Sequence, residues 1–440
     1  MHSDWRRRAG GAAIALPAHR SYHRFVTHVA GNAELAEADA VAPARLRAAL
    51  AEAEPAAAAN PAAVRVVRAP GRVNLIGEHT DYNDGLVLPA AIDLEIRLAI
   101  LATDDRRVEI TLLGSGERRG FDLDALPRPS GAWIDYVAGV AWSLAREGLA
   151  VRGFRGVLAS SLPVSAGLSS SAALELASAW ALLDPPDPAA HATNGMRLAQ
   201  LAQRAENAYV GVRCGLMDQF ASSLGWAGAA MLLDCRSLEY RAVPLPLERH
   251  ALVVCDTGSP RRLGTSEYNA RRAQCERAVT IIARRDPAVR ALRDVDLEAL
   301  NRARSSGELD DETGRLCEHV IRENGRVEAA VEALERGDLD EVGELFAESH
   351  ASLRDLFGVS SPELDAMVEV ATSVPGVVAA RMTGAGFGGC TVNLVEREAV
   401  PRLREVVMRE YPRRTSLQPR VFAVEPADGA GLLAVTDGRA

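Results

Sequence analysis

From about residue 63 onward, short apolar segments of strand type alternate along the chain with longer segments of helical spacing. The stretch "AVRVVRAP" (63–70) predicts a strand that is ended by Pro70. The stretch "GLVLPAAIDLEIRLAIL" (85–101) predicts one or two further strands. The charged and apolar alternation at 106–114 and 118–126 predicts a hairpin.

Helical spacing appears next, at 133–148, where Trp133, Val137 and Leu144 share one face. Further helices are predicted at 171–183 and 195–211, with a strand at 154–162 before them. Additional strands are expected at 229–245, 250–258, 377–382 and 390–395, and helices dominate between about 267 and 372. Strands and helices interleave without strict alternation, so the pattern favours an α+β fold over a doubly wound sheet.

The length of 440 residues suggests two domains rather than a single core. Residues 1–60 are rich in alanine and charge, and we expect them to form a loosely attached extension with one helix around "PARLRAALAEAE". The start of the chain resembles a signal peptide only faintly, because glycines and Pro17 break its short apolar patch.

The chain contains no lysine, so its 50 basic residues are all arginine, and its net charge is −9. The acidic balance argues against a nucleic-acid-binding protein. The absence of lysine excludes a P-loop lysine, a protein-kinase strand lysine and a lysine Schiff base. A phosphate site must therefore use arginine, backbone N–H groups, a metal ion or a combination of them.

The six cysteines are scattered and form no CxxC pair, a pattern that does not fit a structural zinc site or a disulfide framework. We interpret them as reduced thiols of a cytoplasmic protein. No apolar run approaches the roughly 18 residues of a membrane span, and we expect no membrane association.

Three polar or glycine-rich loops interrupt this pattern. The first, "RAPGRVNLIGEHTDYNDG" (68–85), places many hydrogen-bonding side chains between two apolar segments. The second, "PVSAGLSSSAAL" (163–174), puts glycine and serines directly before a helix, whose first N–H groups and dipole suit a phosphate. A serine N-cap before an ordinary core helix is the simpler interpretation, but three consecutive serines favour phosphate binding.

The third loop, "MTGAGFGGC" (382–390), matches the spacing of a dinucleotide fingerprint, but a strand pattern follows it instead of a helix. We therefore reject a nicotinamide-binding fold. The loop is either a tight turn without a role or a backbone wall against a ligand. Asp218, in "CGLMDQF", is either a helix cap or a buried carboxylate near a reacting hydroxyl, and the pattern leaves both open.

Taken together and in this order, the three loops resemble the signature motifs of the GHMP small-molecule kinases. The segment "GEHTDYN" resembles the sugar-recognition signature of the galactokinases, and "WIDYVAGV", "CGLMDQFASSLG" and "SEYNARRAQCERA" add to the resemblance. It extends from about residue 64 to 395. It implies ATP-dependent phosphorylation of galactose at its anomeric hydroxyl, giving galactose 1-phosphate and ADP. Galactose and ATP are then the expected partners, and a monomer is expected.

The resemblance also implies a fold of two α/β domains with the active site between them. Residues 61–245 would form a ribosomal-S5-domain-2-like domain that binds sugar and ATP phosphates. Residues 246–440 would form a ferredoxin-like GHMP domain, and 1–60 would lie outside both.

The same resemblance implies roles for individual residues. Asp218 corresponds to the catalytic aspartate and Arg72 to the arginine beside it, although Arg72 could equally form a structural pair with an aspartate. The resemblance further implies that Ser171 and Glu206 bind magnesium, and both supply the oxygen atoms that this ion prefers. The implied sugar ligands are Glu78, His79, Thr80, Asp81 and Tyr268. The implied ATP phosphate loop consists of Ser165, Ala166, Gly167, Leu168, Ser169, Ser170 and Ser171.

Two departures from the family pattern are visible: Ser165 replaces the first glycine of the usual P-x-G-x-G-L loop, and the N-terminal extension is long. Two alternatives remain. One is a related kinase acting on another sugar, such as an arabinose, N-acetylgalactosamine or uronate 1-kinase. The other is a non-catalytic, sugar- and ATP-responsive regulator, which the intact "GLSSSAA" loop, Arg72 and Asp218 disfavour.

Overall fold

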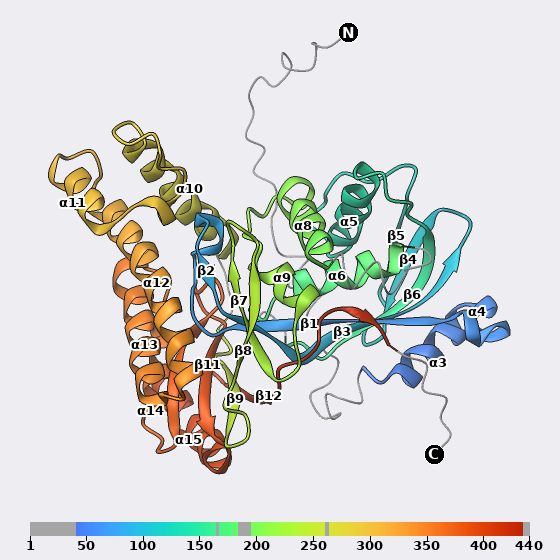
Figure 1. Cartoon of the computed structure of the whole chain (residues 1–440). Coiled ribbons are helices and arrows are strands. Elements are labelled where there is room, and N and C mark those ends of the chain that lie inside the picture. Colours follow the sequence, from blue (N-terminus) through green and yellow to red (C-terminus); the bar gives the residue numbers. More distant parts are fainter. Residues whose placement is uncertain (1–40, 164–166, 184–194, 260–263, 434–440) are drawn as a thin grey trace, which may run out of the picture.

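The structure, a computed structural model, describes residues 41–163, 167–183, 195–259 and 264–433. Its first half is built on a six-stranded sheet with the strand order β13–β1–β3–β6–β4–β5. The long strands β1 and β3 run from helices α3 and α4 to the second half (Figure 1). The strands of this sheet are β1 Arg65–Asn74, β3 Pro89–Thr103, β4 Arg107–Leu112, β5 Arg118–Asp122, β6 Gly153–Ser160 and β13 Gly431–Leu432.

The central strands β1, β3 and β6 of this sheet bury both of their faces. Val67, Leu98 and Leu158 lie in register and contribute to the core on one face, which is covered by helices. These helices are α5 Ile134–Arg146, α6 Ser170–Leu182, α8 Gly195–Ala205 and α9 Met217–Leu224. A second sheet, with the order β2–β7–β8, lies beside it, formed by Leu86–Val87, Ala229–Asp234 and Tyr240–Pro244.

The described part of the N-terminal extension is not loosely attached, so that expectation was wrong for residues 41–59. Helix α3 (Pro43–Ala53), followed by α4 (Pro55–Ala59), packs on the other face of the first sheet. Leu46 and Leu50 are buried there against Val66. The side chain of Val66 lies on the opposite face of β1 from that of Val67, which belongs to the main core. Apolar residues at helical spacing within an alanine-rich stretch were enough to bury this helix.

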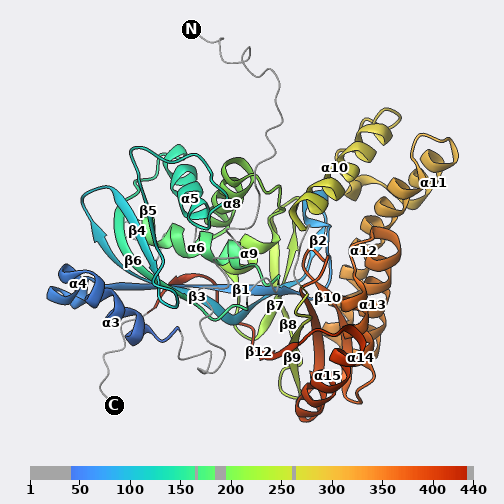
Figure 2. The same cartoon turned by 180° about the vertical axis from the view of Figure 1, so that it is seen from behind.

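The second half contains a four-stranded sheet with the order β10–β11–β9–β12 and a set of helices that is seen from behind in Figure 2. Its strands are β9 His250–Asp256, β10 Val377–Thr383, β11 Cys390–Glu396 and β12 Arg420–Val424. Its helices are α10 Gly264–Ile282, α11 Leu297–Ser305, α12 Asp311–Arg336, α13 Leu339–Ser352, α14 Pro362–Thr372 and α15 Val400–Thr415. Short 3-10 or π turns lie at Pro61–Ala63, Asp81–Asn83, Glu206–Val210, Leu292–Asp294, Leu353–Phe357 and Arg397–Ala399.

The two halves share one core. Val254 and Val392 from the four-stranded sheet belong to the same buried cluster as Val67 from the six-stranded sheet. Residue 245 lies between β8 and β9, where the chain passes from one sheet system to the other. The segment after β12 then returns, because β13 pairs with β1. The α+β expectation is confirmed, whereas the C-terminal residues 431–432 lie on the first sheet and not in the second domain where they were expected.

Strand β1 does not end at Pro70 as predicted, but continues to Asn74 with a register shift between Pro70 and Arg72. The neighbouring strand β13 pairs with β1 only at Val67 and Arg68. Past Arg68 that edge of β1 faces no described strand, so Pro70 interrupts no ladder there. The extended strand brings Arg72 to the end of the sheet, next to the serine loop.

Within the described part of the chain, no helix is long and apolar enough to cross a membrane. The six cysteines are all free thiols, and four of them are buried, as expected for core residues.

Candidate active site

Arg72 and Asp218 form the centre of the site. The guanidinium Nε of Arg72 donates to Oδ1 of Asp218 at 2.8 Å, and its Nη1 donates to the carbonyl oxygen of Gly167 at 2.7 Å. The backbone N–H of Arg72 donates to the carbonyl oxygen of Leu168 at 3.1 Å. Arg72 is 4% exposed, whereas the side chain of Asp218 is 27% exposed. The arginine therefore joins strand β1 to the serine loop and leaves the carboxylate accessible.

Close approach between β1 and the serine loop depends on Gly71. A Cβ at this position would lie 2.5 Å from the carbonyl oxygen of Leu168 and 2.3 Å from a methyl group of Leu162. Both contacts are far inside normal van der Waals distance, so a side chain at residue 71 would separate the strand from the loop.

Asp218 lies in the first turn of α9 and does not act as its N-cap. Its second carboxylate oxygen accepts a hydrogen bond from the hydroxyl of Ser169 at 2.7 Å. Ser169 occupies the N-cap position of α6, with φ of 60°, but its side chain makes no capping bond. The interpretation of Asp218 as a helix cap is therefore wrong, and Ser169 stands at the N-cap position without capping the helix through its side chain.

The loop before α6 turns twice into the left-handed region, at Gly167 (φ 77°) and at Ser169. A non-glycine residue in this region is strained, and such strain is typical of functional loops. Ser170 and Ser171 follow in the first turn of α6, whose N–H groups lack intrahelical partners. Two members of the predicted phosphate loop, Ser165 and Ala166, lie outside the described residues.

Behind this loop lies a buried group of carboxylates. Gln219 donates to Oε2 of Glu206 at 2.7 Å and to Oε2 of Glu175 at 3.0 Å. Burial, and then the charge of Asp218, raise the pKa of Glu206 to about 7, and Ser171 hydrogen-bonds to the same carboxylate. Burial and the charge of Glu206 raise the pKa of Glu175 well above its ordinary value. Carboxylates that repel one another in this way favour a bound cation.

Glu175 was missed at the sequence level. A signal was present, because it is the one charged residue in the otherwise apolar or small helix 170–182. An acidic side chain on such a helix is costly to bury unless it has a specific partner.

The first polar loop brings a second group of predicted residues together. His79 has φ of 65°, and its ring lies 4.5 Å from that of Phe357 and 5.7 Å from that of Tyr268. Its Nδ1 lies 2.9 Å from the hydroxyl of Tyr82. Burial, assisted by the nearby His319, lowers the pKa of His79 to about 3, so the imidazole is neutral.

Asp81, in the same loop, contacts the start of α9, the helix that carries Asp218. It accepts hydrogen bonds from the backbone N–H groups of Tyr82 at 3.0 Å and Met217 at 3.4 Å. Burial, and then the charge of Asp218, raise the pKa of Asp81 to about 6. The predicted sugar residue Asp81 thus lies close to the predicted catalytic carboxylate.

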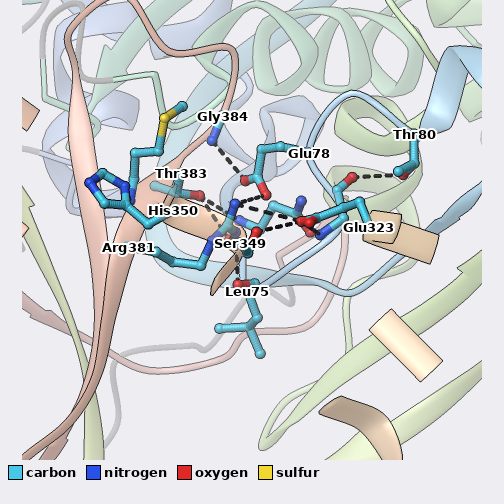
Figure 3. Close-up of polar contacts among 12 residues, drawn as sticks. Leu75, Glu78, Thr80, Glu323, Ser349, His350, Arg381, Thr383 and Gly384 are labelled. Carbon is cyan, nitrogen blue, oxygen red and sulfur yellow. Dashed lines mark hydrogen bonds and ion pairs between the residues drawn. The ribbon is translucent and has the colours of Figure 1, made fainter. Parts of the chain in front are cut away.

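Two loop residues are engaged differently from the others. Thr80 is fully buried, and its Oγ1 lies 2.7 Å from the carbonyl oxygens of both Gly77 and Leu86. This hydroxyl therefore closes the loop internally, and the expectation that Thr80 contacts the sugar is not supported by its geometry. Glu78 is also buried and forms an ion pair with Arg381, while its Oε1 accepts from the backbone N–H of Gly384 at 3.1 Å (Figure 3).

The glycine loop at 384–389 connects the antiparallel strands β10 and β11, which confirms that no dinucleotide-type helix follows it. The backbone N–H of Gly384 contacts the first polar loop, because it donates to the carboxylate of Glu78. The three loops that are separate in the sequence therefore lie around one site.

Comparison with known proteins supports the grouping of these loops. Three family models match the chain: the galactokinase galactose-binding signature at 57–101, the GHMP kinases N terminal domain at 135–225 and the GHMP kinases C terminal at 330–413. A galactokinase of Roseiflexus sp. (strain RS-1) is 44% identical over 368 residues, which cover 83% of this chain and 92% of the relative. A galactokinase of Chloroflexus aggregans is 45% identical over 376 residues, covering 84% and 93%.

Among solved structures, the Lactococcus lactis galactokinase complexed with galactose superposes with a TM-score of 0.80 at 34% identity, covering 88% of this chain and 99% of that one. A mevalonate kinase superposes with a TM-score of 0.55 at 18% identity, covering 82% and 99%, and shares the fold. The first similarity extends over nearly the whole described chain and coincides with the three loops. The chain therefore belongs to the galactokinase family of the GHMP kinases.

Proposed function

We propose that this protein transfers the terminal phosphoryl group of ATP to the anomeric hydroxyl of galactose, giving galactose 1-phosphate and ADP. As a GHMP kinase it uses ATP. The observation that carries the proposal is the contact of Asp218 with both Arg72 and Ser169, because it joins a carboxylate to the loop that would hold the phosphates. Phosphoryl transfer depends mainly on such positioning and on charge stabilisation.

In this mechanism Asp218 orients the attacking hydroxyl and receives its proton as the phosphoryl group arrives. Arg72 holds Asp218 in place and stabilises the negative charge that moves between ATP and sugar. Its two further bonds to the serine loop fix it without help from a substrate. The N–H groups at the start of α6, with the loop from Ser165 to Ser171, bind the phosphates.

The sugar is proposed to bind between the first polar loop and α10. Asp81 accepts hydrogen bonds from sugar hydroxyls. Glu78, which lies against β10, also accepts from a sugar hydroxyl, and the neutral His79 offers one nitrogen as donor or acceptor. Tyr268 lies next to His79 and Tyr82, with its ring 5.4 Å from that of Tyr82. We leave Thr80 out of the ligand set, because its hydroxyl is used within the loop.

A magnesium ion is proposed to bind to Ser171 and Glu206. The buried carboxylates Glu206 and Glu175 fit this assignment, since burial and then repulsion between carboxylates raise their pKa values, and a cation would offset both effects. Within the described residues no cluster of three or more His, Cys, Asp or Glu side chains forms a metal site, so phosphate and water oxygens would complete the shell. When bound, the ion neutralises charge on the ATP phosphates.

We further propose a cytoplasmic monomer with its domain boundary near residue 245. The free state of all six cysteines supports a reducing compartment. The passage from β8 to β9 at this residue supports the boundary, with the terminal strand β13 assigned to the first domain.

The decisive experiment measures ADP release with galactose, glucose, arabinose and N-acetylgalactosamine as separate substrates. We expect galactose to give the highest kcat/KM, and we expect Asp218→Ala to abolish the turnover. Higher activity on another sugar would move the chain to a related sugar kinase. Equal ADP release with and without any sugar would contradict the kinase assignment.

A further inference from the structure

Arg381 is a completely buried arginine outside the catalytic centre. It lies on β10 of the second half, and its side chain is 0% exposed. Its Nη1 donates to the carbonyl oxygen of Leu75 at 2.8 Å, and its Nη2 forms an ion pair with Oε2 of Glu78 (Figure 3). A charged side chain is almost never fully buried unless it is paired, so this arginine needs its carboxylate partner.

The loop that carries Glu78 is attached to the second half by further bonds. The N–H of Gly77 donates to Oε1 of Glu323 on α12 at 3.1 Å, and His319 Nε2 lies 3.1 Å from the carbonyl oxygen of Glu78. Oε1 of Glu323 is 4.0 Å from the guanidinium of Arg381. The loop follows β1 in the sequence, but these contacts hold it on β10 and α12.

Two residues along β10 from Arg381, Thr383 points to the same side of the strand. Its hydroxyl lies 2.9 Å from the backbone N–H of Asn74 and 3.0 Å from its carbonyl oxygen. Strand residues at this spacing share a face, so Arg381 and Thr383 of β10 both hydrogen-bond to the backbone at the end of β1. The position of Glu78 relative to the sugar is therefore set by the second half.

We propose that Arg381 is a positioning residue for sugar recognition, which holds the Glu78 carboxylate in the orientation that accepts a hydrogen bond from a sugar hydroxyl. This inference rests on the proposed role of Glu78 as a sugar ligand. One oxygen of Glu78 accepts from Gly384 and the other faces Arg381, and a carboxylate has capacity for further donors.

The electrostatics of the pair support the same role. Burial raises the pKa of Glu78, and the charge and hydrogen bond of Arg381 act against this rise. Without the guanidinium, the buried carboxyl would bind a proton more readily and lose its strength as an acceptor. Sugar binding would then acquire a second dependence on pH, through Glu78, that a purely structural role of Arg381 would not produce.

Arg326 offers a matched control. It is also buried, on α12, and its Nε donates to Oε2 of Glu323 at 2.7 Å. It belongs to the same ionic cluster as Arg381, and the bonds described for it reach Glu323 and not Glu78. Arg326→Met and Arg381→Met thus remove the same chemical group from the same region, and only the second removes a partner of Glu78.

The experiment compares the steady-state kinetics of Arg381→Met, Arg381→Lys, Arg326→Met and Glu78→Gln. Loss of a hydrogen bond to a charged group predicts a rise in the KM for galactose of about 10- to 100-fold in Arg381→Met, with the KM for ATP within about threefold of wild type. Arg381→Lys should restore part of the loss, because its charge remains. In Arg381→Met, 1/KM for galactose should begin to fall at a higher pH than in the wild type.

The double variant Glu78→Gln/Arg381→Met keeps the test informative if Arg381→Met alone does not fold, because it removes both buried charges. Its KM for galactose should rise no further than in Glu78→Gln, since the two residues act as one unit. An additive effect of the two changes, or an equal rise in Arg326→Met, would overturn the positioning role. An unchanged KM in Glu78→Gln would instead contradict the proposed sugar site itself.

Discussion

Nη2 of Arg72 lies 2.6 Å from Oδ1 of Asp218, so a nearly buried cation is held against a carboxylate that solvent and substrate can reach. Arg72 is also fastened to the serine loop by its Nη1 and its backbone N–H. The pair is therefore held in place by contacts within the protein. Such organisation lowers the cost of reaching the charged transition state.

We expect Asp218→Asn and Arg72→Met each to lower kcat by roughly 10²- to 10⁴-fold, the range typical of lost acid–base or charge-stabilising groups. The proposed sugar ligands lie mostly on the polar loop, so galactose binding should be largely kept. Isothermal titration with galactose and a coupled ADP assay measure the two effects separately. A variant with near-normal turnover would contradict the assigned roles.

The bond from Ser169 to Asp218 predicts a second, smaller effect. Removing its hydroxyl should lower kcat by about 10- to 100-fold, because a hydrogen bond to a charged group is lost. Ser169→Gly and Ser169→Ala both remove the hydroxyl, and kcat should fall equally in the two variants.

These two variants also control for backbone strain. Since φ of residue 169 is 60°, glycine fits this position without strain, whereas alanine retains a cost of about 1 kcal/mol. Thermal unfolding should therefore rank Ser169→Gly above Ser169→Ala. If kcat followed stability instead of the missing hydroxyl, the direct role of Ser169 would be wrong.

Periodicity and turn residues were sufficient to predict most strands and helices, because apolar spacing directly reflects which face is buried. The hairpin at 106–126 and the paired strands around the glycine loop were predicted in this way. The continuation of β1 past Pro70 could not be predicted, since it depends on how far β13, from the other end of the chain, extends beside it.

Residues of the candidate site could be predicted from the sequence only where they belong to a family motif. Family motifs placed Asp218, Arg72 and Asp81 correctly in one region, but they could not show that the hydroxyl of Thr80 turns back into its own loop. Arg381 was not singled out by any such motif. Its partner Glu78 lies on a distant segment, and an arginine in a strand is not recognisable as buried until both segments are placed.

The raised pKa of Asp81 predicts that galactose binding weakens in mild acid. Its carboxyl, with a pKa of about 6, is ionised at pH 7.5 and largely protonated at pH 5, where it no longer offers a charged acceptor. We expect 1/KM for galactose to fall about tenfold per pH unit below pH 6. Asp81→Asn should bind galactose weakly and without this pH dependence.

Acid unfolding through Asp81 does not explain such a loss. A pKa raised in the folded state means that protonation of this group stabilises the fold, and that this contribution is lost as pH rises through about 6. Circular dichroism at pH 5 should therefore show folded protein. A flat profile of KM for galactose between pH 5 and 8 would contradict a role of ionised Asp81 in binding.

Gly215 determines where the Asp81 carboxylate can lie. A Cβ on residue 215 would be 1.8 Å from Oδ2 of Asp81 and 2.1 Å from its Cγ. Gly215→Ala must therefore displace the carboxylate, while the backbone at this residue needs no left-handed conformation. A displacement of about 1 Å at a reacting centre costs roughly 100-fold in rate, so we expect a fall of this order in kcat/KM for galactose.

Gly325 on α12 supplies the matched control, because no heavy atom lies within 4 Å of a Cβ built on it. Gly325→Ala should keep the kinetics of the wild type and stabilise the helix by about 0.5–1 kcal/mol. Steady-state kinetics with galactose and thermal unfolding of both variants distinguish a local clash from a general effect of alanine. Wild-type kcat/KM in Gly215→Ala would show that Asp81 can move without consequence, and would remove it from the set of sugar ligands.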